Sequence, residues 1–75
     1  MINYYLRPDK AHIRIDDENK VATNVLTLGD HKFIGHITNS DYVDNMIGMI
    51  DKLTPIDQAT FEAELQEAKN ILINV

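Results

Sequence analysis

Apolar and polar positions alternate along the first 38 residues, the pattern of strands that bury one face of a sheet. Ile2, Tyr4 and Leu6 share one side of the first alternating segment, and Ile13 and Ile15 share one side of the second. The next two segments are rich in the β-branched and aromatic residues that strands favour. We therefore expect four strands, at residues 2–7, 12–15, 20–28 and 31–38.

Short connections with turn residues join these segments. Gly29–Asp30 is a two-residue hairpin signal with glycine first, as a type II′ turn requires. Pro8–Asp9 supplies a second two-residue turn, and residues 16–19 form a polar four-residue connection. The turns predict which residues lie opposite one another, and such partners share a face. The expected pairs are Leu28–His31, Leu26–Phe33, Ala22–Ile37, Ile13–Ala22, Tyr4–Ile13 and Leu6–Ala11.

This register gathers most apolar side chains on one face of a meander. The residues expected on it are Ile2, Tyr4, Leu6, Ile13, Ile15, Ala22, Leu26, Leu28, Phe33 and Ile37. The opposite face carries basic and polar residues with three aliphatic ones among them, namely Tyr5, Arg7, Lys10, His12, Arg14, Val21, Thr23, Val25, Lys32, Ile34, His36 and Thr38. We expect this second face to be open to solvent or to a partner, with Tyr5, His12, Thr23 and His36 in one row across it.

The apolar spacing changes to a helical period after residue 38. One helix is expected over residues 39–53, with a capping box starting at Thr38. Its apolar side chains fall within one arc of about 160°, taking 100° per residue: they are Tyr42, Val43, Met46, Ile47, Met49, Ile50 and Leu53. The opposite arc is polar and contains Gly48, whose presence costs a helix about 1 kcal/mol relative to alanine. Gly48 is either a neutral surface position or a point where another chain's backbone approaches closely.

A second helix is expected over residues 54–72, with Thr54 as N-cap and Pro55 in its first turn. Phe61, Leu65, Ala68 and Leu72 form its apolar stripe, and the final segment 71–75 could instead form a short strand. The predicted fold is α+β: a four-stranded antiparallel β-meander (residues 1–38) followed by two helices (39–75), both packed on the apolar face. The whole chain, 1–75, is expected to be a single small domain.

Charge is distributed unevenly along the chain. The net charge is −5, and basic and acidic residues balance within 1–38, so the excess belongs to 39–75. A basic sheet face opposite an acidic helical surface is therefore expected. There is no cysteine, no pattern of a signal peptide and no apolar run long enough to span a membrane. We expect a cytoplasmic protein, in a host cytoplasm if the chain is of phage origin, that binds no membrane.

Candidate chemistry is sparse. His12 and His36 could face one another across two strands, but a zinc site needs a third ligand and supporting hydrogen bonds. The segment HITNSD holds His36, Ser40 and Asp41, the residue types of a catalytic triad, without the strained turn that such a serine requires. Helix capping is an adequate explanation of Ser40 and Asp41, so we expect no catalytic site here. No phosphate-binding or dinucleotide motif is present, so we expect neither an enzyme nor a cofactor.

Three hypotheses for function follow. The first is a non-catalytic module that binds another protein, as an acidic inhibitor of phage or mobile-element origin, through Asp41, Asp44, Gly48 and Asp51. The second is a homo-oligomer in which acidic and basic faces of neighbouring copies meet. The third is an oligomeric binder of a small anion such as a nucleotide, on the row of Tyr5, His12, Arg14 and His36. Bulk nucleic-acid binding is not expected, because the chain is acidic and offers one aromatic on that face.

Overall fold

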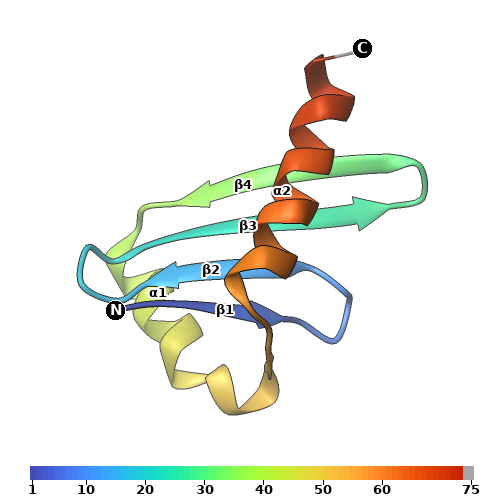
Figure 1. Ribbon diagram of the computed structural model, residues 1–75. Helices are drawn as coiled ribbons and strands as arrows, with labels where there is room; N and C mark the ends of the chain where they lie inside the picture. Colours follow the sequence, from blue (N-terminus) through green and yellow to red (C-terminus); the bar gives the residue numbers. More distant parts are fainter. Residues whose placement is uncertain (74–75) are drawn as a thin grey trace.

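The computed structural model describes residues 1–73 and shows an α+β fold in which an antiparallel sheet carries one helix on each face (Figure 1). The sheet order is β4-β3-β2-β1-β5. The strands are β1 (Ile2–Leu6), β2 (His12–Asp16), β3 (Val21–Leu28), β4 (His31–Ile37) and β5 (Thr54–Pro55). The helices are α1 (Ser40–Gly48), the short 3-10 helix η1 (Ile50–Lys52) and α2 (Gln58–Ile73).

The predicted four-stranded meander and the β3–β4 hairpin are confirmed. Leu28 lies opposite His31, Leu26 opposite Phe33 and Ala22 opposite Ile37, as the Gly29–Asp30 turn predicts. Gly29 has φ +60°, the left-handed value that the first turn position of a type II′ hairpin needs and that glycine adopts without strain.

The predicted register of the first hairpin is wrong by one residue. Tyr5, not Tyr4, pairs with Ile13, and Leu6 pairs with His12. Pro8 and Asp9 do not close a two-residue turn, because Lys10 joins the loop in a left-handed conformation (φ +73°). Proline suits type I turns, which close hairpins with an additional left-handed residue. The extra residue exchanges the faces of β1, since strand side chains alternate.

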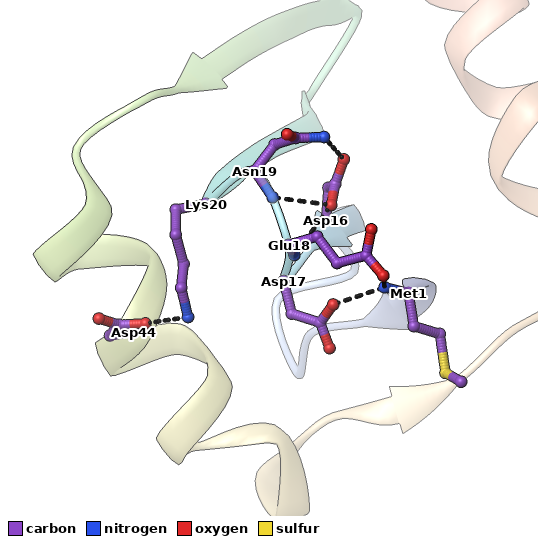
Figure 2. Close-up of polar contacts among 7 residues, drawn as sticks. All are labelled: Met1, Asp16, Asp17, Glu18, Asn19, Lys20 and Asp44. Carbon is purple, nitrogen blue, oxygen red and sulfur yellow. Dashed lines mark hydrogen bonds and ion pairs between the residues drawn. The ribbon is translucent and has the colours of Figure 1, made fainter.

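The β2–β3 connection also differs from the prediction, but without exchanging faces. Ile15 rather than Ile13 pairs with Ala22, a shift of two residues. Asp16 remains in β2, and its carboxylate accepts hydrogen bonds from the backbone N–H groups of Glu18 and Asn19 (Figure 2). Lys20 takes the left-handed conformation (φ +56°) that completes the turn. A hydrogen bond from the Asn19 side chain, together with these backbone bonds, holds the pKa of Asp16 below its usual value.

The first predicted helix is divided into two pieces. Asn39, not Thr38, is the N-cap of α1, and its side chain accepts the N–H of Tyr42 at 3.0 Å. The α-helix ends at Gly48, where the Met49 N–H turns back to Met46 O in the tighter spacing that precedes η1. Gly48 is thus the last residue of α1 and not a mid-helix position.

The start of the second helix was predicted three residues too early, with Thr54 rather than Asp57 as its N-cap. Thr54 and Pro55 pair with Leu6 and Tyr5 as β5, and the N–H of Ile56 donates to Tyr4 O at 3.0 Å. Asp57 is the N-cap of α2, because its carboxylate accepts the Thr60 N–H at 2.7 Å. Residues 71–73 belong to α2, whereas the strand suggested for 71–75 would extend outside the described residues.

The two helices pack on opposite faces of the sheet, not on the same face as predicted. Val43 of α1 packs with Ile13, Ile15 and Ala22. Phe61 and Ala68 of α2 pack with Val25, which belongs to the opposite face. At the edge of the sheet next to β1, β5 carries the chain from the α1 side to the α2 side (Figure 1). The molecule therefore has two small cores, one on each side of a single sheet.

Candidate interaction surface

The sheet face predicted to be open is covered by α2. The Arg14 guanidinium lies over the Phe61 ring, 5.4 Å from its centroid, and the Tyr4 and Phe61 ring centroids are 5.5 Å apart. Lys32 forms an ion pair with Glu64 of α2, with 11% and 17% of the two side chains exposed. Lys32 also donates to Thr27 at 2.8 Å. Arg14 and Lys32, two basic residues of this face, thus contact α2 and hold it in place.

The predicted ligand-binding row does not form. Tyr5 lies on the α1 side with Ile13, whereas His12, Arg14 and His36 lie on the α2 side. The row that crosses four strands is Tyr4, Arg14, Thr23 and His36. Arg14 donates to the Thr23 hydroxyl at 3.3 Å, and that oxygen lies 3.3 Å from His36 Nδ1. Because Thr23 is only 6% exposed, its hydroxyl joins neighbouring strands beneath α2 and faces no open site.

The expected separation of a basic face from an acidic face is also absent. The predicted acidic helical surface is divided, because α1 and α2 lie on different sides of the sheet. Glu64 faces the sheet, where Lys32 holds the pKa of its carboxyl below the usual value. The hypothesis of a nucleotide site required an open basic face, and the hypothesis of assembly by opposite charges required a basic face and an acidic face. Neither feature is present as predicted.

The residues predicted to bind a protein partner do lie together on the outside of α1 and η1. Asp41, Asp44 and Gly48 are three, four and seven residues apart, which places them on one helix face, and all are exposed. Asp51 is exposed in the following η1. No atom outside the local helix lies within 4 Å of where a Cβ on Gly48 would be, so this position opens to solvent.

The β2–β3 turn adds further carboxylates next to α1. Lys20 in this turn donates to Asp44 Oδ1 at 2.6 Å, and the Met1 amino group contacts Asp17 at 2.7 Å (Figure 2). Asp17 and Ile50 of η1 line one small hollow. The acidic surface therefore continues from α1 through η1 to the turn, with Lys20 tying its two parts together.

Two large apolar side chains stand exposed beside these carboxylates. Tyr42 and Met49 are each 53% exposed, although the helical pattern places them in the buried arc. Both line a hollow between α1 and the sheet that also contains Ile37 and Met46. The apolar arc predicted for this helix is about 160° wide, and the sheet covers only part of it. Tyr42 and Met49, at the edge of the arc, therefore stay exposed to solvent. Tyr42 lies in the first turn of α1 and Met49 directly follows its last residue, and their spacing of seven residues is the signal that could have identified them. We define the α1 surface as Asp41, Tyr42, Asp44, Gly48, Met49 and Asp51.

Among residues 1–73, no three histidine or carboxylate side chains approach closely enough to hold a metal ion. No helix in the same range has the length and apolar character to cross a membrane. Known proteins give no guide, because no family model, curated protein or solved structure matches the chain.

Proposed function

We propose that this chain is a small non-catalytic module that binds another protein through the α1 surface. The observation that carries the proposal is the exposure of Tyr42 and Met49, which line one hollow and are close in sequence to Asp41 and Asp51. Tyrosine and methionine are enriched in protein interfaces, and an apolar centre with a charged rim is their usual arrangement. On the basic face, Arg14 and Lys32 are already engaged with Phe61 and Glu64 of α2.

The partner is expected to present a basic surface with an apolar recess. Asp41, Asp44 and Asp51 are exposed on this surface, and the neighbouring turn adds Asp17 and Glu18, whose carboxylates contact the Met1 amino group. Complementary charge accelerates encounter, and the aromatic and thioether groups supply buried contact area. A basic groove that normally holds nucleic acid has this chemistry, so an inhibitor of a nucleic-acid-binding protein is the form of the proposal that we favour.

Affinity capture with surface variants tests this proposal. The wild-type chain, immobilised and exposed to a lysate of cells that naturally contain it, is expected to retain one protein in stoichiometric amount. The double variant Tyr42→Ser/Met49→Ser should lose that protein, since the apolar centre of the surface is gone. Asp41→Asn/Asp44→Asn/Asp51→Asn should weaken retention most at low salt, where charges are least screened.

Ile2→Ser is the matched control, because Ile2 is an exposed apolar side chain in β1 and outside the α1 surface. It should retain the partner as the wild type does. Equal retention by the control and by the Tyr42/Met49 variant would exclude the α1 surface. Retention of no protein by the wild type would contradict the proposed function itself.

A further inference from the structure

The two edges of the sheet are protected very differently. β5 at one edge has two residues and includes Pro55, which cannot donate a backbone hydrogen bond to a neighbouring strand. β4 at the other edge has seven residues without proline, and its Phe33 side chain is 52% exposed. Proteins usually shorten, charge or cover an edge strand, because its free backbone groups pair with other strands. In residues 1–73, nothing pairs with the outer side of β4.

The outward backbone groups of β4 can be assigned from the register. Hydrogen-bonded and non-hydrogen-bonded pairs alternate in antiparallel strands. Arg7 N bonds to Ala11 O, and Asp17 N bonds to Met1 O, so these are hydrogen-bonded pairs at the ends of β1 and β2. The register of β2 with β3 and of β3 with β4 then gives the hydrogen-bonded pairs in the rest of the sheet. His31, Phe33, Gly35 and Ile37 then bond to β3. The N–H and C=O groups of Lys32, Ile34 and His36 point outward, with Ile34 at the centre of the strand.

α2 covers only one half of this strand. It holds Lys32 through Glu64 and contacts Ile34, but His36 remains exposed. Beyond the sheet, the C-terminal turns of α2 extend past the β4 edge (Figure 1). One half of β4 thus lacks a cover on the α2 side, while the end of α2 projects over empty space next to the edge.

We propose that a second copy of this chain pairs with β4 about a two-fold axis at Ile34, joining two sheets into one. Lys32 of one copy then lies opposite His36 of the other, and Phe33 lies opposite Gly35, which has no side chain to obstruct it. Because the two-fold exchanges the halves of β4, the projecting end of each α2 covers the exposed His36 half of the other copy. The uncovered half of β4 in each copy is thus covered by the C-terminal end of α2 from the other copy.

Two further observations favour a second copy over an unrelated strand. The only charged side chain on β4 is Lys32, and Glu64 neutralises it, so two acidic chains can meet here without repulsion. At the end of β4 lies a hollow lined by Ile37, Thr38 and Tyr42 among others. In the proposed register, His31 of the second copy lies opposite Ile37, which brings the Gly29–Asp30 turn of that copy to this hollow.

Molar mass and residue-resolved hydrogen exchange of the purified wild-type chain test the proposal. Light scattering should show a dimer that dissociates on dilution. In the dimer, the amides of Lys32, Ile34 and His36 should exchange at least roughly tenfold more slowly than in diluted protein, since they become hydrogen-bonded. The amides of Phe33 and Gly35 are an internal control, because they are bonded to β3 in either state.

Two lysine variants distinguish edge pairing from other contacts. Phe33→Lys places a charge on the edge and should give a folded monomer, whereas Leu28→Lys should remain dimeric. Leu28 is the matched control, because it is 56% exposed on the same sheet face but belongs to β3. A wild-type monomer at every concentration overturns the proposal. So does a dimer whose Lys32, Ile34 and His36 amides exchange as in the monomer, or one that Phe33→Lys leaves intact. The α1 surface could still bind another protein in each case.

Discussion

At the scale of single residues, the Lys32–Glu64 ion pair stabilises the packing of α2 on the sheet. Both side chains are largely buried between β4 and α2, and Thr27 contacts both of them. Removing one member of such a pair leaves the other charge without its partner, which is costly away from water. The ion pair therefore favours the one position of α2 on the sheet in which Glu64 lies next to Lys32.

Replacing Glu64 with glutamine should lower the free energy of unfolding by about 2 kcal/mol at neutral pH, because a charged hydrogen bond is lost. Lys32 lowers the pKa of Glu64 in the folded state, so the stabilisation is complete above the ordinary glutamate pKa, about 4.3. It is lost as the pH falls through the folded-state pKa. Urea unfolding of wild type and Glu64→Gln across this acid range should show the difference shrinking. A difference independent of pH would contradict the role of the pair.

Gly48 gives a second residue-scale prediction. It ends α1 with open space around it, and its φ is not in the left-handed region. Gly48→Ala should therefore stabilise the protein by about 0.4–1 kcal/mol, mainly by restricting the unfolded chain. Thermal unfolding should show an increase of a few degrees. If the stabilised variant also loses the captured partner, another chain approaches α1 at this point; if capture is unchanged, Gly48 is a neutral position.

At the scale of elements, the structure and the sequence prediction differ in the N-cap of α2, which is Asp57 and not Thr54. Asp57→Ala should cost about 1 kcal/mol, since an N-cap carboxylate satisfies a backbone N–H that would otherwise lack a partner. Thr54→Ala should cost much less, because Thr54 is exposed in β5 and caps no helix. Urea unfolding of both variants measures this contrast. A larger loss of stability for Thr54→Ala than for Asp57→Ala would contradict this assignment and indicate that Thr54 is the N-cap.

The elements also show what the sequence could and could not predict. The β3–β4 hairpin was predictable because Gly29–Asp30 specifies its turn and hence its register. The β1–β2 register was not, because Pro8–Asp9 is compatible with loops of two or three residues, and the choice exchanges Tyr4 and Tyr5 between faces. Val21, Val25 and Ile34 on the supposedly open face were the signal that a helix covers it. Asp41, Asp44 and Asp51, which were predicted to bind a partner, are exposed, and their binding role stays a prediction. Tyr42 and Met49 were wrongly assigned to the core.

At the scale of the whole molecule, function is constrained by which surfaces the two helices leave free. α2 covers the basic face, and α1 covers only part of the other face. The surfaces that remain exposed include the α1 surface, with Tyr42 and Met49, and the outer edge of β4, whose end lies next to Tyr42. A small domain buries a limited fraction of its surface, so single exposed apolar side chains are ordinary. The proposal therefore depends on the fact that Tyr42 and Met49 line one hollow beside exposed carboxylates.

The most direct test of the central claim is a photo-crosslinking amino acid at position 49, introduced in cells that naturally contain the protein. Met49 is exposed on the α1 surface and does not belong to the β4 edge. The same group at position 2 serves as the control, since Ile2 is exposed elsewhere. Binding through the α1 surface predicts one discrete adduct with another protein after illumination, at position 49 and not at position 2. No adduct at position 49, or only one with twice the mass of the chain, would contradict it.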